Sequence, residues 1–200
     1  EEVIGYHLEQ AYRYRTELSP VTDREQDLAA RAGLRLAPAG IRAFERRDIP
    51  AATDLLGRAT ALLPRAHPDR RVALIALGEA MEEAGDLGPA LDAFGEAEIS
   101  AKEADDAVTA ANAAILRLFL SEMTDPGTAA EPLHQAEGLI ATLEGAGDDR
   151  GLARVWILIG NLHWDHARYG DADDAIARSI EHARRAGATR EEFDAMGRYT

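Results

Sequence analysis

Residues 71–102 read RVALIALGEAMEEAGDLGPALDAFGEAEISAK and carry the clearest structural pattern in the chain. Apolar side chains recur every three or four residues on both sides of Gly85-Asp86, which predicts two amphipathic helices joined by a tight turn. Gly85 suits the left-handed conformation that ends a helix, and Asp86 can cap the next helix by accepting from its free N–H groups. Such a hairpin is too small to have its own core, so it must stack on copies of itself.

The same turn pattern recurs along the chain. We place four aspartates between helices, 38, 39 and 46 residues apart: Asp48, Asp86, Asp125 and Asp171. An alanine follows each of them after four residues, at Ala52, Ala90, Ala129 and Ala175. Eight residues after each aspartate come Leu56, Phe94, Leu133 and Ser179. Four matches in register predict a repeat of helical hairpins.

The pattern of small and large residues around these turns resembles the repeat motif of the tetratricopeptide repeat (TPR) family. In residues 71–102 the resemblance rests on Leu74, Leu77, Gly78, Met81, Gly85, Asp86, Leu87, Ala90, Phe94 and Ala97. The preceding unit matches through Gly40, Phe44, Asp48, Ile49, Ala52, Leu56, Ala59 and Pro64. The later units depart from the motif: Arg117 and His163 replace the helix-packing glycine, and Ser179 and His182 replace the later aromatic residue and alanine.

The resemblance implies an all-α fold, a right-handed α-solenoid of about four TPR-like hairpins with an N-terminal helix and a partial fifth unit. We expect one domain over residues 1–200. Its parts are an N-terminal helix at 1–20, units at 23–64, 68–102, 105–145 and 149–187, and the start of another unit at 189–200. Pro38 lies inside a helix expected from Arg24 to Arg47 and predicts a kink or break there. Thr128 and Glu131 form a capping-box pattern that predicts a helix start.

A second resemblance lies near the N-terminus. Residues 5–12, GYHLEQAY, precede an arginine-rich helix and a Leu-Ser-Pro turn. This run is similar to the start of the C-terminal helical-repeat region of bacterial multidomain signalling proteins built around an AAA- or STAND-type ATPase. Some of those proteins also carry a cyclase or a DNA-binding domain. The resemblance implies a regulatory or sensor arm, and the chain opens on Glu1-Glu2 without a methionine, as expected of a piece excised from a larger protein.

The composition excludes several classes of protein. Hydrophobic residues make up 46% of the chain but aromatic residues only 6%, so the core must consist mainly of alanine and leucine. The absence of cysteine excludes disulfides and thiolate metal sites. A formal net charge of −14 argues against a nucleic-acid partner, although it also serves solubility. We expect a cytoplasmic protein, because no membrane-spanning run or signal-peptide pattern is present.

The first helix of each repeat unit lines a concave groove in the TPR family, and we project the binding residues from that likeness. They are Ile41, Phe44, Ile75, Glu79, Glu82, Ile115, Leu118, Glu122, Asn161, Trp164 and Arg168. The projected groove has an apolar floor with acidic flanks. It predicts an amphipathic or basic protein segment as the ligand, including another domain of the same polypeptide. The alternative is that several of these side chains are buried.

Some TPR proteins hold a terminal carboxylate with Lys, Asn and Arg at fixed groove positions. In this chain those positions carry Ile75, Ala76 and Glu79 in the second unit. In the third unit they carry Ala114, Ile115 and Leu118. We therefore do not expect capture of a carboxylate terminus.

No catalytic or metal centre is expected. His163 and His166 share one helix face, but no carboxylate from a second helix completes a metal site in the sequence pattern. The run Glu79, Glu82 and Glu83 is typical of a solvated helix face. Phosphate-binding loops and nucleophile motifs are absent, so we expect neither enzyme activity nor a cofactor.

One alternative function remains, a small-ligand or peptide sensor whose groove closes near Phe119, Trp156 and Trp164. A deep enclosed pocket would favour this sensor, whereas a shallow open groove favours a protein-interaction scaffold. Self-association is a further expectation, because the terminal helices of a solenoid have no neighbouring unit on one side.

Overall fold

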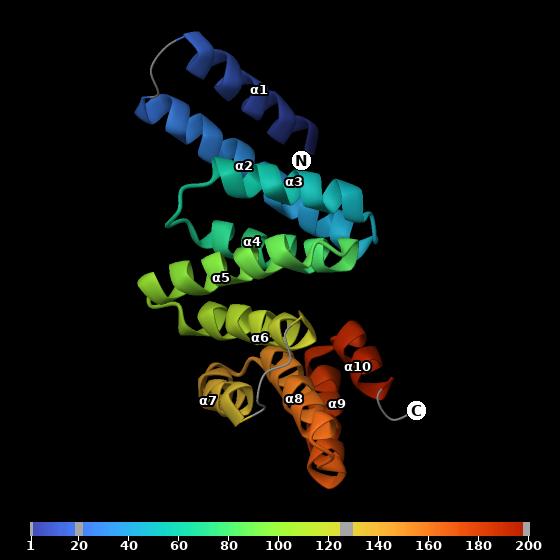
Figure 1. The fold of residues 1–200 in the computed structure, drawn as a ribbon. Coiled ribbons are helices and arrows are strands. Elements are labelled where there is room, and N and C mark those ends of the chain that lie inside the picture. Colours follow the sequence, from blue (N-terminus) through green and yellow to red (C-terminus); the bar gives the residue numbers. More distant parts are fainter. Residues whose placement is uncertain (1, 19–21, 125–129, 198–200) are drawn as a thin grey trace. The chain divides into compact units, whose positions relative to one another are not determined.

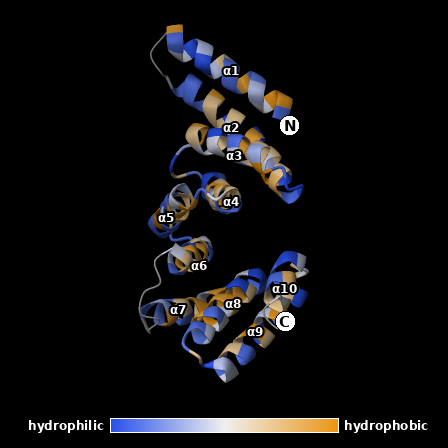
Figure 2. Cartoon of the chain, turned by 45° about the vertical axis from the view of Figure 1, so that its right-hand side comes forward, coloured by the Kyte–Doolittle hydropathy of each residue, from blue (hydrophilic) through white to orange (hydrophobic). Residues whose placement is uncertain are grey.

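The computed structural model describes residues 2–18, 22–124 and 130–197, and these contain helices and turns but no strand (Figure 1). The helices are α1 (Glu2–Leu18), α2 (Asp23–Glu45), α3 (Ile49–Leu62), α4 (Pro68–Ala84), α5 (Leu87–Glu103), α6 (Ala107–Thr124), α7 (Ala130–Ala146), α8 (Asp149–Asp165), α9 (Tyr169–Ala186) and α10 (Thr189–Met196). Most of them carry both hydrophilic and hydrophobic residues, as amphipathic helices do (Figure 2).

Consecutive helices pack in pairs: α2 with α3, α4 with α5, α6 with α7, and α8 with α9. This confirms the all-α helical-repeat fold predicted from the sequence. The chain divides into two compact units, residues 1–105 and residues 106–200, where the sequence predicted one continuous domain. None of the helices in the described residues is long and apolar enough to cross a membrane.

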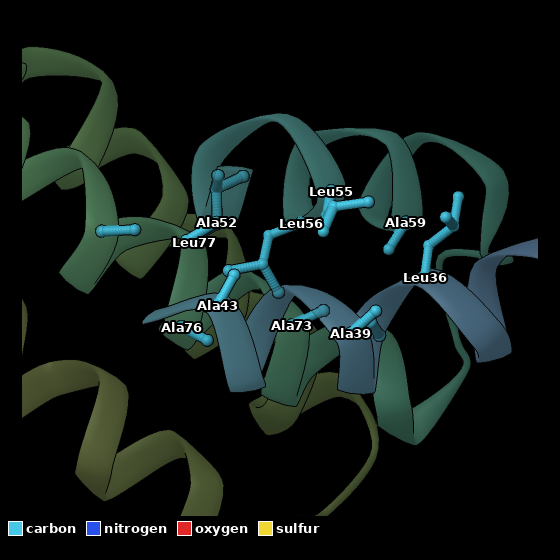
Figure 3. Close-up of a cluster of buried hydrophobic side chains, with 12 residues drawn as sticks. Leu36, Ala39, Ala43, Ala52, Leu55, Leu56, Ala59, Ala73, Ala76 and Leu77 are labelled. Atoms are coloured by element: carbon cyan, nitrogen blue, oxygen red, sulfur yellow. The ribbon is translucent and has the colours of Figure 1, made fainter. Parts of the chain in front are cut away.

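Each unit has its own core of small and aliphatic side chains. In the first unit, residues from α2, α3 and α4 interdigitate, with Leu36 and Leu56 fully buried among alanines (Figure 3). In the second unit, residues from α6, α7, α8 and α9 form a separate cluster that includes Leu143, Leu158 and Ile159. The alanine-rich composition thus serves close helix packing, as the low aromatic content predicts.

The turns after α2, α4, α7, α8 and α9 share one backbone geometry. One residue of each turn has a positive φ between 55° and 85°, and these residues are Arg47, Gly85, Gly147, Ala167 and Gly187. The next residue donates its N–H to a carbonyl five residues earlier at 2.9 Å, the longer hydrogen bond of a Schellman motif. The donors are Asp48, Asp86, Asp148, Arg168 and Ala188, and each also caps the following helix.

The geometry of these turns corrects the register predicted for the fourth unit. Asp171 lies inside α9, and Arg168 occupies the turn position instead. Counting from Arg168, the helix-packing glycine is Gly160 and its large partner is Ile176, so His163 does not replace that glycine. The aspartate alignment was wrong there because this cap works through the backbone and needs no aspartate side chain. Asp125 and Thr128, used in the third unit, lie outside the described residues.

With the corrected register, three hairpins show the same contact. A Cβ added to Gly40 would lie 2.6 Å from Leu56 Cγ, and one added to Gly160 would lie 2.7 Å from Ile176 Cδ1. Gly78 meets the ring of Phe94 in the same way. Ser179 falls at the position of Ala59 and Ala97, where it is fully buried and donates to the Ala153 carbonyl at 2.7 Å.

Two local predictions about helix ends and breaks differ from the structure. Helix α2 runs without interruption through Pro38, so of the predicted kink or break the break is absent; packing of α2 against α3 and α4 offsets the missing hydrogen bond. Asp86 precedes α5 but makes no side-chain cap, whereas Asp48 and Asp148 accept from Ala51 N at 3.3 Å and Gly151 N at 3.0 Å.

Helix α1 is held against the rest of the first unit by an ion pair with a buried carboxylate. The Glu9 side chain is 2% exposed and accepts hydrogen bonds from Arg58 on α3 and from Arg13 on its own helix. Glu9 holds the pKa of Arg58 above its ordinary value through these hydrogen bonds. Gly5 lets α1 approach α2 closely, since a Cβ there would lie 2.9 Å from Leu36 Cδ2.

Candidate protein-binding face

Within each unit, the first helices of successive hairpins contact one another. Helix α2 contacts α4 in the first unit, and α8 contacts both α6 and α10 in the second. The second helices, α3 and α5 or α7 and α9, make no such contact in the part of the chain that the structure describes. The first helices therefore form the inner side of each unit.

In the first unit, the predicted groove residues lie on these inner helices. Ile41 and Phe44 on α2 are half-buried and pack on the edge of the unit's core. On α4, Ile75, Glu79 and Glu82 are half-buried as well. The structure thus leaves part of each of these five side chains, three apolar and two acidic, exposed on the inner helices.

Glu83 belongs to the same acidic run but has an evident structural partner. Both of its carboxylate oxygens accept from Arg47 Nη1, each at 2.7 Å. This pair joins the end of α4 to the turn after α2. Glu83, which was predicted to lie on a solvated helix face, therefore connects two hairpins.

In the second unit, the predicted groove residues separate into two groups. Ile115 and Leu118 are only 1% and 6% exposed and belong to the core, so they do not line a surface. Both pack between α6, α7 and α8. The projection from the repeat motif did not take the packing of these helices into account. Glu122 and Asn161 are half-buried, Arg168 is exposed, and Trp164 is 53% exposed.

Asn161 and Trp164 come together in a shallow pocket of about 190 Å³. The remaining lining residues come from α8, α9 and the end of α10: Gly160, Ala172, Asp173, Ile176 and Gly197. The Tyr169 ring lies edge-on to the Trp164 ring, with centroids 5.0 Å apart and planes at 68°. Tyr169 and Asp173 were not predicted from the sequence, because the predicted register of α9 was wrong.

A second hollow, of about 220 Å³, lies in the first unit between the α3–α4 turn and α5. Arg70 crosses it and donates from Nη2 to Glu96 Oε1 at 2.8 Å and from Nε to the Thr60 carbonyl at 2.9 Å. Ser100 Oγ donates to the Arg65 carbonyl at 3.2 Å. These contacts join three successive helices, so the polar groups of this hollow have a structural role.

The two histidines near the end of α8 differ: His166 has a contact on its own helix, whereas Nδ1 of His163 is buried without a hydrogen-bond partner among the described residues. His166 Nδ1 lies 3.0 Å from the Leu162 carbonyl on its own helix. Burial, with a further contribution from Arg168, lowers the pKa of His163, which favours the neutral ring. No group of three or more His, Cys, Asp or Glu side chains in the described ranges could hold a metal ion.

His182 lies at a contact between α8 and α9. Its Nδ1 is 2.7 Å from Asp149 Oδ1, and Arg185 Nε donates to the same oxygen at 3.0 Å. Hydrogen bonds from Arg185 and then from His182 hold the pKa of Asp149 below its ordinary range. The three side chains tie the start of α8 to the end of α9.

The aromatic residues named for a closing ligand pocket do not gather around one cavity. Phe119 and Trp156 are half-buried and pack against the core of the second unit. The Arg178 guanidinium covers Trp156, 4.7 Å above its ring centroid. Neither Phe119 nor Trp156 lines the pocket beside Trp164.

Comparison with known proteins adds a fold relationship. No protein-family model matches the chain, and no curated protein matches it in sequence. The chain is similar in structure to aspartyl phosphate phosphatase F from Bacillus subtilis, with a TM-score of 0.65 and 10% sequence identity. The two share a helical fold. The match covers 88% of this chain but only 45% of the phosphatase, so the chain spans less than half of that protein's length.

Proposed function

We propose that this chain is a non-catalytic protein-interaction scaffold whose first helices bind a segment of a partner protein. The proposal rests on one observation: inside each unit, the first helices of successive hairpins contact one another. These helices therefore present side chains on a common face. Repeats of this kind create extended binding surfaces from their stacked inner helices.

The chemistry of the inner side favours a basic amphipathic segment. Ile75 and Phe44 supply apolar surface on neighbouring helices, and Glu79 and Glu82 supply negative charge beside it. The net charge of −14 adds a long-range attraction for a cationic partner. A helix with one apolar and one basic face matches this pattern.

The size of the hollows argues for this scaffold over a small-ligand sensor. Pockets that enclose a small molecule usually measure about 300–1,000 Å³. The hollow beside Trp164 measures about 190 Å³ and that beside Arg70 about 220 Å³. Both are too small to enclose such a ligand, but the hollow beside Trp164 can accept one side chain of a protein.

In a longer polypeptide, the scaffold would act as a regulatory arm. The resemblance of the N-terminal run to helical-repeat regions of bacterial ATPase signalling proteins supports this role. The bound segment would then belong either to a separate protein or to another domain of the same polypeptide.

Selection from a displayed library of random helical peptides tests the proposal. We expect the immobilised 200-residue chain to enrich amphipathic sequences rich in lysine and arginine. Ile75→Ser should weaken binding of the enriched peptides about tenfold or more, because it removes apolar contact at the centre of the inner side. Ile99→Ser is the matched control, since Ile99 is 61% exposed on the second helix α5.

Circular dichroism should first show that both variants keep the helical content of the parent chain. Failure to enrich any peptide would count against a scaffold. Equal loss of binding in the Ile75→Ser and Ile99→Ser variants would show that the inner helices are not the binding side.

A further inference from the structure

The pocket beside Trp164 has features of a specific side-chain site. Trp164 is on the last turn of α8 and keeps 53% of its surface exposed. Ala172 and Ile176 of α9 contribute apolar lining, and Gly160 contributes a wall without a side chain. An indole is costly to expose to water, so an exposed tryptophan at the edge of a hollow points to a contact that the isolated chain does not make.

Tyr169 holds the indole in a defined orientation. The two rings meet edge to face at 5.0 Å, an arrangement that favours one position of both side chains. Tyr169 is itself 54% exposed. The pair therefore presents an ordered aromatic surface next to the pocket, and little conformational entropy is lost when a ligand binds to it.

The electrostatic surroundings select a cation. Asp173 and Asn161 both line the pocket. Asp165 at the end of α8 and Asp171 and Asp174 in the first turns of α9 are exposed. Between Trp164 and Asp174 the sequence has four carboxylates and one arginine, Arg168. A positive group is therefore attracted here both by the carboxylates and by the face of the indole.

The other tryptophan shows the same pairing within this chain. The Arg178 guanidinium lies 4.7 Å above the Trp156 ring. A planar guanidinium can stack on an indole while its edge donates to carboxylate and amide oxygens, which a lysine ammonium cannot do as well. The pocket beside Trp164 has the same kind of aromatic ring, with Asp173 and Asn161 in its lining.

We infer that this pocket binds an arginine side chain on a helical segment of a partner protein, stacked on Trp164 and hydrogen-bonded to Asp173 and Asn161. The inference rests on the proposed scaffold function and adds an anchor point to it. It assigns to Trp164, Tyr169 and Asp173 a role in choosing the partner, since segments without a correctly placed arginine would bind less tightly.

The two tryptophans make a direct measurement possible. In a Trp156→Phe background of the full chain, Trp164 is the sole tryptophan and its emission reports the pocket. The probe is an 18-residue amphipathic helical peptide with leucines on one face and four arginines on the other. A second peptide has citrulline at the four arginine positions, which keeps the shape and removes the charge, and a third has lysine.

We expect the arginine peptide to shift Trp164 emission and to bind about tenfold more tightly than the citrulline peptide. Trp164→Ala and Asp173→Asn, each measured by fluorescence anisotropy of labelled peptide, should weaken the arginine peptide by a similar factor. Neither substitution should affect the citrulline peptide. Asp92→Asn is the matched control, because it removes the same charge from an exposed position on α5 that does not line the pocket.

The possible failures are distinguishable. If the arginine peptide binds and Ile75→Ser weakens it, but Trp164→Ala and Asp173→Asn do not, the scaffold stands and the arginine site is refuted. Equal affinity for the arginine and citrulline peptides would show that the pocket takes an apolar side chain. A shift of Trp164 emission by N-acetylarginine amide without binding of any peptide would replace the protein partner with a small cation and would also count against the scaffold.

Discussion

At Gly78, the absence of a side chain sets the distance between α4 and α5. The ring of Phe94 occupies the place where a Cβ would stand, and Phe94 is fully buried, so its ring has no room to move aside. Gly40 with Leu56 and Gly160 with Ile176 repeat this contact in other hairpins. Single atoms at these positions therefore control the packing of whole helices.

Gly78→Ala should destabilise the chain by about 1–3 kcal/mol, because the overlap with Phe94 exceeds the roughly 1 kcal/mol gained in helix propensity. Gly57→Ala is the matched control inside α3, where a Cβ would meet nothing within 4 Å. It should leave stability unchanged or raise it by about 0.5–1 kcal/mol. Urea unfolding followed by circular dichroism measures both, and a stabilised Gly78→Ala variant would contradict the packing described for this hairpin.

At the scale of elements, the repeated turn sets how one helix follows another. One residue of the turn needs a positive φ, which glycine adopts without strain and other residues adopt at a cost in free energy. Gly85, Gly147 and Gly187 meet this need, whereas Arg47 and Ala167 occupy the same conformation with a side chain. The hairpin is thus specified by the backbone of its turn, and the identity of the capping residue is secondary.

Ala167→Gly should raise the free energy of unfolding by about 0.5–1 kcal/mol, since it relieves a left-handed alanine at φ 55°. Gly187→Ala, at φ 62° in the equivalent turn before α10, should lower it by about 1 kcal/mol. Thermal unfolding of the two variants beside the parent chain gives the comparison. A lower melting temperature for Ala167→Gly would show that the turn tolerates alanine without strain.

Helix α10 is joined to α8 by a buried carboxylate that titrates. Glu191 Oε1 accepts from Arg150 Nε at 2.6 Å and from Arg154 Nε at 3.1 Å. Burial raises the pKa of Glu191, but the two arginines more than offset this, so its pKa lies below its ordinary value. A lowered carboxyl pKa stabilises the folded chain above about pH 4.5, and this contribution disappears as the pH falls through the folded value.

Glu191→Gln should therefore destabilise the docking of α10 by about 1–3 kcal/mol at pH 7 and make it less sensitive to acid. Hydrogen exchange of the α10 amides at pH 7 and at pH 4 measures the effect. Glu192→Gln is the control, because Glu192 pairs with Arg184 at 2.7 Å near the surface. Equal loss of protection in both variants would argue against a special role for Glu191.

At the scale of the whole molecule, the chain consists of two compact units with separate cores. Among the residues that the structure describes, the buried cluster of the first unit comes from α2, α3 and α4, and that of the second from α6 to α9. A unit with its own core can fold by itself. The binding surface proposed for the inner side of each unit therefore does not need the other unit for its stability.

We expect residues 1–105 and residues 106–200, produced separately, each to be helical and to unfold cooperatively. Circular dichroism during thermal unfolding tests this, with the full chain as the reference. The fragments should retain most of the helical signal of the full chain when their spectra are added. An unfolded fragment would show that the two units depend on each other.

The sequence by itself determined the helices and the hairpins, because the signals that specify them are local. Gly78 and Phe94 lie close together along the chain, and the turn at Gly85-Asp86 joins them, so their contact could be predicted from spacing alone. Only the tertiary structure decided the register at Arg168, where the backbone caps a helix without an aspartate. It also buried Leu118 in the core, since burial depends on which helices pack on α6.

The candidate binding site divides in the same way. Trp164 and Asn161 could be predicted from their position on a first helix, because that position follows from the repeat. Their pairing with Tyr169 and Asp173 could not, since it depends on where α9 begins after the turn. Helix periodicity is encoded within a few residues, whereas pockets and cores arise from contacts between separate helices, and these depend on geometry that spacing alone does not contain.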